Sequence, residues 1–318
     1  MYTFRPFRNS DPPRLAEIWR NQPAQRELLQ PMTAGLWDQL VLSKQYFDPA
    51  GLIVALHDGV PVGFVHAGFG PSDDERSVST YLGTTYLLML RDPHREVALA
   101  HALLERAENY LRDRGSKVIY AGGIRPLNAF YLGLYGGSDL PGVLAGDVVF
   151  AEACRRNGYR EVDRVAILQR DLASFRPPFS RTIRQLRRET TIREEPSPPA
   201  GSWWSACTTG HFDQARFTLE PAAGGTMLAE VRFWDIEPLS TGWGVPTSGM
   251  IDLQVSSERR RQGLATYLLS EAFPRLLSRG VVRVEAQTMH TNAPAIALYK
   301  RLGFEAVAEG IVFRKDSQ

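Results

Sequence analysis

The feature that most constrains this chain is an internal repeat. The segment REVALAHALLERAENYLRDRG, Arg95 to Gly115, aligns without gaps with RRQGLATYLLSEAFPRLLSRG, Arg260 to Gly280, 165 residues further on. Nine of the 21 positions are identical, whereas ordinary composition would give about one or two. Two unrelated amphipathic helices ending in glycine would share part of this match, but the arginine that begins both segments favours duplication. We therefore expect two copies of one structural unit.

The residues around both copies predict the same unit. The strand-like runs YLGTTYLLMLRD and SGMIDLQVSS precede the two helices, and KVIYAGG and VVRVEAQT follow them. Each half is thus a strand, a turn, a helix and a second, parallel strand. We expect an α/β fold of two domains in tandem, each with a central mixed β-sheet flanked by helices. The predicted bounds are 1–173 and 201–318, with residues 174–200 as a linker that contains a basic helix.

Composition excludes several classes of protein. A chain of 318 residues suits about two domains, and 37 Lys and Arg against 35 Asp and Glu leave a net charge of +2, too balanced for a nucleic-acid-binding face. No run of 18 apolar residues is present, so we expect no membrane span, and the first residues do not show the charged-then-apolar pattern of a secretion signal. Cys154 and Cys207 are expected to be reduced thiols without metal spacing. We expect a cytoplasmic protein with no metal, nucleic-acid or membrane partner.

The turn before the second helix carries the strongest chemical signal. A helix start leaves backbone N–H groups unpaired at the positive end of the helix dipole, and Gly263 lets a ligand approach that backbone closely. Arg260 and Arg261 add positive charge, so the turn is a candidate pyrophosphate site. The alternative is an ordinary basic loop that caps a helix.

The context of this turn favours the first interpretation. The order strand, R-x-x-G-x-A, helix, strand and then NAPAIALYKRLGF, Asn292 to Phe304, resembles the GNAT superfamily of acyl-CoA-dependent N-acyltransferases, including its tandem two-domain members. The resemblance is close over about residues 248–313 and looser in the first half. It implies acetyl-CoA as the co-substrate and gives the residues of the second half the following roles.

The resemblance implies that Leu253, Gln254 and Val255 pair with the pantetheine arm of the cofactor. It implies that one run of residues surrounds the pyrophosphate: Arg260, Arg261, Gln262, Gly263, Leu264, Ala265 and Thr266. Asn292 would hold the pantetheine or orient the thiol end. Tyr299 would protonate the departing thiolate as a general acid, although a tyrosine packed on the core is the alternative. Pro274 departs from the pattern and should kink the helix or mark its end.

The general base is left open. Asp252, Glu285 and His290 lie on or near the central strands and are candidates, although each is also an ordinary solvated or capping residue. In many members of the superfamily water relays the proton, so the pattern does not require a base.

The first half preserves the motif less well. Arg95 remains, but Val97 and Ala98 replace Gln262 and Gly263. Tyr135, in NAFYLGLYGG, takes the place of Tyr299 if residues 133–146 are inserted within the helix, and it is a second candidate catalytic residue. This glycine-rich insertion is interpreted as a ligand-binding or mobile loop, with a plain surface insertion as the alternative.

Together these features predict an acetyl-CoA-dependent N-acetyltransferase that acts on a small amine and has its catalytic site in the second domain. The alternative is a non-catalytic acyl-CoA-binding or sensor protein. The second domain lacks the two early helices of the first, which predicts that the first domain or a partner subunit completes the acceptor wall. A monomer or a homodimer is expected. The run Arg181, Arg184, Arg187 and Arg188 predicts a solvated linker helix, or else a helix that docks between the domains.

Overall fold

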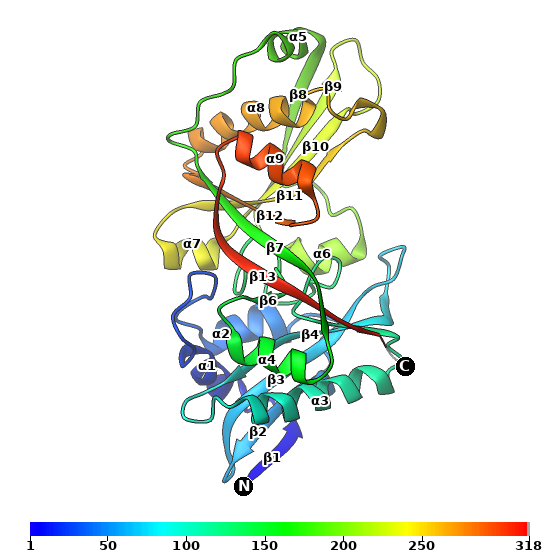
Figure 1. Cartoon of the computed structure of the whole chain (residues 1–318). Coiled ribbons are helices and arrows are strands. Elements are labelled where there is room, and N and C mark those ends of the chain that lie inside the picture. The colour runs from blue at the N-terminus through cyan, green and yellow to red at the C-terminus, as the bar shows by residue number, and fades with distance from the viewer. Residues whose placement is uncertain (317–318) are drawn as a thin grey trace.

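The two halves of the chain share one continuous β-sheet. The structure, a computed structural model, describes residues 1–316, and the strand order is β1-β2-β3-β4-β5-β13-β7-β12-β11-β10-β9-β8, with β6 paired to β13 off this path. Helices lie against the sheet in both halves (Figure 1). The predicted mixed α/β fold is confirmed, and the sheet also runs unbroken from one half into the other.

The first half contains most of its helices and strands in the predicted order. Its elements are β1 (Tyr2–Pro6), α1 (Pro12–Arg20), α2 (Ala34–Trp37), the π-helical turn η1 (Asp38–Leu42), the 3-10 turn η2 (Pro49–Gly51), β2 (Leu52–His57), β3 (Val60–Pro71), β4 (Val78–Leu90), α3 (Val97–Asp113), β5 (Val118–Ala121), β6 (Val143–Leu144), α4 (Val148–Arg156) and β7 (Arg160–Asp171). The hairpin of β2 and β3 turns at Asp58 and Gly59, both with positive φ, as the Asp-Gly pair predicts.

The second half repeats this order with fewer early helices. Its elements are α5 (Arg181–Glu189), β8 (Thr190–Pro196), α6 (Trp203–Thr209), β9 (Gln214–Pro221), β10 (Ala229–Asp235), α7 (Glu237–Trp243), β11 (Thr247–Val255), the 3-10 turn η3 (Ser257–Arg259), α8 (Leu264–Ser278), β12 (Arg283–Met289), α9 (Ala293–Arg301) and β13 (Glu305–Asp316). Helix α8 runs through Pro274 and does not end there.

The identical residues of the repeat are largely core residues of two matching helices. Leu99, Leu103, Leu104, Ala107 and Leu111 of α3 are buried, and so are their counterparts Leu264, Leu268, Leu269, Ala272 and Leu276 of α8. Each helix covers its own half of the sheet and packs into its own hydrophobic cluster. The repeated residues therefore form the buried, apolar face of each helix, which packs on the sheet in both halves.

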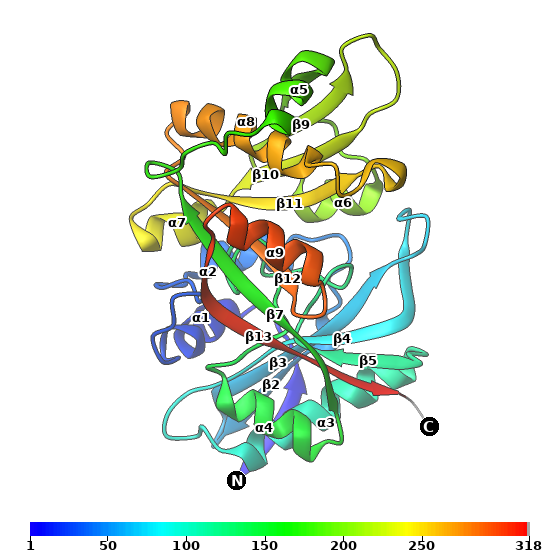
Figure 2. The same cartoon turned by 45° about the horizontal axis from the view of Figure 1, so that its top comes forward.

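The halves are joined by an exchange of strands. β13, the last strand of the chain, lies between β5 and β7, while β7, the last strand of the first half, lies between β13 and β12. Figure 2 shows β7 and β13 lying side by side as they run from one half to the other. Each half therefore completes its sheet with a strand from the other.

The glycine-rich insertion is buried between the halves, so the expectation of a surface insertion is wrong. Nearly all of residues 132–144 are buried, and Val143 and Leu144 pair with β13. Gly137, with φ of 127°, passes so close to Glu285 of β12 that a Cβ there would overlap the carboxylate. The insertion is therefore a buried wedge that packs against β10, β12 and β13 of the second half.

Helix α5 packs on the second half instead of standing free in a linker. Ile183 and Leu186 are buried in the same cluster as α8, and Arg187 pairs with Glu271 of α8. Arg181, Arg184 and Arg188 are exposed. Only the polar side of this helix is solvated, which corrects the expectation of a linker helix free in solvent. Within residues 1–316, no helix combines the length and the apolar character needed to cross a membrane.

Candidate functional site

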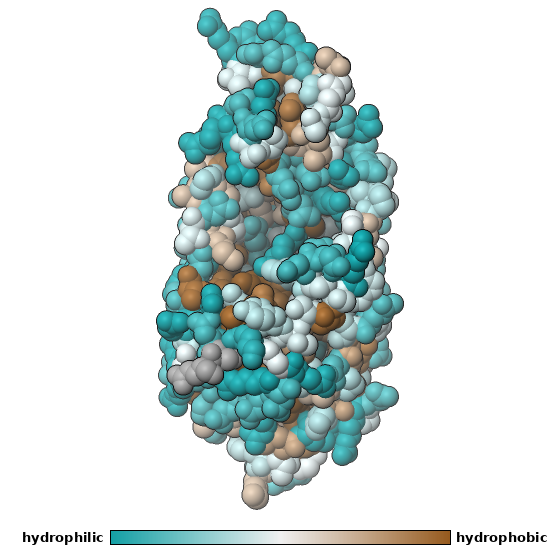
Figure 3. All heavy atoms as spheres, turned by 90° about the vertical axis from the view of Figure 1, so that its right-hand side faces the viewer, coloured by the Kyte–Doolittle hydropathy of each residue, from teal (hydrophilic) through white to brown (hydrophobic). Residues whose placement is uncertain are grey.

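A large cavity opens where two parallel strands part. β11 and β12 are paired from Thr247 and Arg283 to Met250 and Ala286, and the pairing stops there. The cavity, of about 1040 Å³, is lined by the second part of β11, the turn before α8, and α9. Figure 3 shows a largely hydrophilic face that is hollowed between its upper and lower parts. A cavity of this size accommodates a large cofactor.

The cavity edge of β11 is reshaped by a β-bulge. Arg232 and Glu230 of β10 face Ile251 and Gln254, so β11 carries one extra residue between these pairs. Asp252 at the bulge has φ of 53°. Because β12 has already diverged, the backbone of Leu253 to Val255 presents an edge to the cavity without a strand partner, and an extended ligand can pair with such an edge.

The start of α8 forms the basic end of the cavity. Gly263 caps the helix in a left-handed conformation with φ of 82°, and no side chain caps it. The N–H groups of Leu264, Ala265 and Thr266 make no hydrogen bond within the described chain. These free donors lie at the positive end of the helix dipole, so they form an anion site.

Three arginines surround this anion site. Arg259, Arg260 and Arg261 all line the cavity. Arg260 Nε donates to Val255 O at 3.4 Å, whereas the guanidinium groups of Arg259 and Arg261 have no ion-pair partner within residues 1–316. Unpaired guanidinium groups beside free N–H donors match a phosphate or pyrophosphate.

Tyr299 lies on α9 and lines the same cavity. The residue is 6% exposed, and its ring centroid lies 5.3 Å from that of Phe304. Its hydroxyl makes no hydrogen bond to any described residue. Burial raises the pKa of Tyr299 to about 12. The phenol is therefore fully protonated near neutral pH and free to donate a hydrogen bond into the cavity.

Most of the predicted cofactor residues meet at this cavity. Lining residues among them are Leu253, Gln254, Val255, Arg260, Arg261, Gly263, Leu264, Ala265, Thr266 and Asn292. Gln262 is the exception, because it is not part of the lining, and its Nε2 donates to Glu258 O at 3.5 Å. Asn292 also caps α9, since its side chain accepts from Ala295 N.

The three candidate bases lie in different surroundings. Asp252 lines the cavity, whereas His290 is exposed outside it. Glu285 is fully buried beneath the wedge and accepts hydrogen bonds from Ser138 N at 2.6 Å and Gln169 Nε2 at 2.8 Å. Burial raises the pKa of Glu285. Of the three, only Asp252 faces the cavity.

In the first half, β4 and β5 also separate at the equivalent place, but the gap between them is occupied by side chains. β4 and β5 stop pairing at Thr85 and Ala121, each 165 residues before Met250 and Ala286. Leu87 and Met89 of β4 share a core cluster with aromatic residues of the segment after β5, namely Phe130, Tyr131 and Tyr135. The β4 residues beyond the split, Leu87 to Leu90, are therefore covered by core side chains, whereas their counterparts Asp252 to Val255 on β11 line the cavity.

The first-half counterpart of the basic turn is also occupied. Arg95 Nη2 donates to Asn21 O at 2.9 Å, and its Nε donates to Leu90 O at 3.3 Å. Helix α3 begins at Val97, so Ala98 is already helical where Gly263 caps α8. In this turn the arginine is thus bonded to backbone carbonyls of the first half and is not free for a phosphate.

Tyr135 lies apart from Tyr299. It is 3% exposed, and its hydroxyl accepts a hydrogen bond from Leu144 N at 2.7 Å. It is absent from the cavity lining that includes Tyr299. The structure therefore does not bring the two predicted catalytic tyrosines together.

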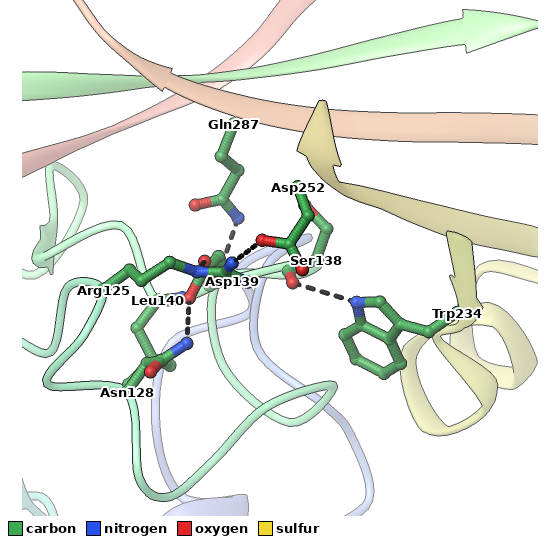
Figure 4. A network of polar contacts seen from close by, with 8 residues as sticks. All are labelled: Arg125, Asn128, Ser138, Asp139, Leu140, Trp234, Asp252 and Gln287. Atoms are coloured by element: carbon green, nitrogen blue, oxygen red, sulfur yellow. Dashed lines mark hydrogen bonds and ion pairs between the residues drawn. The ribbon is translucent and has the colours of Figure 1, made fainter. Parts of the chain in front are cut away.

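The first half contributes side chains to the mouth of the cavity that sequence reasoning missed. Arg125, Ser138 and Asp139 line it alongside β11. Arg125 forms ion pairs with Asp139, at 3.0 Å, and with Asp252, and Gln287 donates to Asp139 O at 2.9 Å. Figure 4 shows these residues converging from the loop after β5, from β11 and from β12. The available signal was weak: Arg125 lies shortly after β5, and the equivalent strand of the second half, β12, contributes Gln287 and Thr288 to the cavity.

The described chain contains no group of three or more His, Cys, Asp or Glu residues placed to hold a metal ion.

Comparison with known proteins gives a consistent family match. The profile of the Acetyltransferase (GNAT) family matches twice, over residues 14–136 and 180–304. A stretch of 60 residues is 37% identical to the mycothiol acetyltransferase of Corynebacterium jeikeium and covers 19% of this chain. The chain matches only 17% of the length of that relative.

Solved structures share the fold over nearly the whole chain. A glucosamine N-acetyltransferase region of a fungal multi-domain β-N-acetylglucosaminidase has a TM-score of 0.73 at 16% identity, over 99% of this chain and 38% of that chain. A GCN5-related N-acetyltransferase from Sphaerobacter thermophilus has a TM-score of 0.65 at 15% identity, over 99% and 95%. A tandem GNAT protein from clavulanic acid biosynthesis has a TM-score of 0.65 at 14% identity, over 99% and 98%. These solved structures therefore share the fold of the chain over nearly its whole length, and one of them is itself a tandem GNAT protein.

Proposed function

Because this chain belongs to the Acetyltransferase (GNAT) family, we propose that it is an acetyl-CoA-dependent N-acetyltransferase whose second half carries the catalytic site and whose acceptor is a small amine. The observation that carries this proposal is the cavity in which the edge of β11, the free N–H groups at the start of α8 and Tyr299 meet. The equivalent cleft of the first half is filled by side chains, and its arginine is held by backbone carbonyls.

The phosphate end of acetyl-CoA would lie at the start of α8. The free N–H groups of Leu264 to Thr266 donate to the pyrophosphate, and the guanidinium groups of Arg259, Arg260 and Arg261 neutralise its charge. The donors are fixed by the helix before the ligand arrives, so little ordering entropy is lost on binding.

The pantetheine arm would pair with β11 beyond the bulge, as an added strand pairs with a sheet edge. With the pyrophosphate at the turn before α8, an arm that runs along β11 would place the thioester near Asp252 and the mouth of the cavity. Arg125, Ser138 and Asp139 of the first half lie there, so the first half supplies part of the acceptor wall.

In the reaction, the amine nitrogen bonds to the thioester carbon, and the carbon–sulfur bond breaks. The Tyr299 hydroxyl donates a hydrogen bond, and then its proton, to the sulfur as negative charge develops there. Its pKa of about 12 keeps it protonated beforehand. The proton that the amine loses leaves towards Asp252 or solvent, and the phenol is reprotonated from solvent.

Calorimetric titration with acetyl-CoA tests the proposal. We expect one site in the wild type, with affinity reduced about tenfold or more in Arg261→Ala and Arg260→Ala, since each removes a charge-assisted contact worth about 1.5–3 kcal/mol. Arg95→Ala is the matched control, because Arg95 is the repeat counterpart of Arg260 and is bound to backbone carbonyls. Absence of acetyl-CoA binding would refute the proposal, and a second site lost with Arg95→Ala would make both halves binders.

A further inference from the structure

A second cavity lies beyond the ion pair at the mouth of the first. It has a volume of about 290 Å³, at the lower end of the range for small-molecule sites. Arg125, Ile251 and Asp252 line both cavities. Glu75 and Asn128 of the first half and Trp204 and Arg232 of the second half contribute to its wall. The second cavity is thus built by both halves and adjoins the bulge of β11.

Arg232 brings an unpaired positive charge into this cavity. It lies on β10, directly opposite Ile251 on one side and Arg216 on the other, and it is partly buried. Arg216 is neutralised by Glu230 and Glu195, whereas the Arg232 side chain makes no ion pair or hydrogen bond to any described residue. A guanidinium that has given up part of its hydration without a partner favours an incoming anion.

Acceptor groups lie on the other walls of the same cavity. Asp252 uses Oδ1 for Arg125, and its Oδ2 has no hydrogen-bond partner in the described chain. The Glu75 side chain is also unpaired within residues 1–316, while its backbone oxygen accepts from Trp204 N at 3.1 Å. Free carboxylate oxygens attract an ammonium group, and those of Asp252 are at the junction with the first cavity.

We propose that the second cavity binds the acetyl acceptor and that this acceptor is a small amine carrying an anionic group, of carboxylate or phosphate type. Arg232 binds the anionic group, and Asp252 draws the amine to the junction of the two cavities, where the thioester would lie. This inference rests on the proposed function. A neutral or purely cationic amine would leave the Arg232 charge uncompensated, so it would bind more weakly.

The test uses pairs of amines that differ only in the anionic group. Ornithine is compared with 1,4-diaminobutane, and O-phosphoethanolamine with ethanolamine, by measuring the release of the CoA thiol. We expect the wild type to favour the anionic member of at least one pair by about tenfold or more in kcat/KM. The preferred pair identifies the anion as carboxylate or phosphate.

Substitution of Arg232 then locates the preference. Arg232→Gln should remove it by lowering kcat/KM for the anionic amine only, with acetyl-CoA affinity unchanged, and Arg232→Lys should restore it in part. The control is Arg193→Gln, an exposed arginine of β8 paired with Glu220. Equal loss for both members of a pair, or equal use of them by the wild type, would overturn the inference but leave the proposed function intact.

Direct binding measurements distinguish the inference about the second cavity from the proposed function. Calorimetric titration with the two anionic amines, in the presence of CoA, should show binding that Arg232→Gln weakens. Binding without any acetyl transfer would support an anion-binding cavity but refute the proposed function, and with it the role of this cavity as the acceptor site. If neither anionic amine binds, the inference is wrong.

Discussion

Arg125 and Asp252, 127 residues apart in sequence, form an ion pair across the boundary between the two halves. Arg125 lies on the loop after β5, and Asp252 on the bulge of β11, where two cavities adjoin. The nearby charges of Asp139 and Asp252 raise the pKa of Arg125, so the guanidinium stays charged. The pair fixes a first-half loop against the strand that would hold acetyl-CoA.

Replacing Arg125 is expected to impair transfer more than cofactor binding. Arg125→Ala leaves the carboxylates of Asp139 and Asp252 without the cation that they share, so they repel each other and the loop is released from β11. We expect kcat/KM for the amine to fall by about tenfold, with the calorimetric Kd for acetyl-CoA changing less than threefold. Arg160→Ala, which breaks an exposed pair with Asp316, is the control. Unchanged kcat/KM would show that the pair has no part in acceptor binding.

Tyr299→Phe is expected to reduce kcat by about 10²–10⁴-fold, because a general acid of this kind contributes that much. The affinity for acetyl-CoA should be unchanged, since the ring packing with Phe304 remains. Rapid-quench kinetics with saturating amine measures the effect. A variant with normal kcat would favour a binding protein or a different proton donor.

Tyr135→Phe is expected to act on stability. The Leu144 N–H loses its acceptor, so the free energy of unfolding should fall by about 1–3 kcal/mol, as measured by denaturant titration. Its kcat should equal that of the wild type. A loss of kcat in a stably folded Tyr135→Phe protein would give the first half a role in catalysis.

The pH profile of kcat/KM should lack an alkaline limb from Tyr299. Its pKa is raised to about 12, so the active, protonated form is lost only as pH rises through that value. Between pH 6 and 10 we expect kcat/KM to rise with deprotonation of the acceptor amine and then level off. Stopped-flow or thiol-release profiles measure this. A fall below pH 10 that disappears in Tyr299→Phe would contradict the buried phenol.

Gly137→Ala should destabilise the junction of the halves. A Cβ there would overlap the carboxylate of Glu285, which is held by Ser138 N and Gln169, so about 1–3 kcal/mol of stability should be lost. Gly224→Ala is the matched control, because Gly224 also has positive φ but open space around it. Thermal unfolding of both variants measures the difference, and equal losses would mean that only backbone strain matters.

Much of the candidate site could be predicted because its signals are local. The free N–H groups of α8 and the glycine at its start, Gly263, are encoded in a short run of residues, and Tyr299 lies on the next helix along the chain. The same locality explains the misses. Arg125 and Arg232 have no distinctive neighbours in sequence, and they join the site only because separate loops and strands converge on β11.

The sequence by itself determined the duplicated strand–helix–strand units, the buried faces of α3 and α8, and the weaker motif of the first half, because periodicity and turn chemistry act over a few residues. Only the tertiary structure decided that β7 and β13 exchange places, that residues 132–144 form a buried wedge, and that the gap between β4 and β5 is filled. Strand order and the filling of a gap depend on pairing and packing between distant segments, which no local pattern specifies.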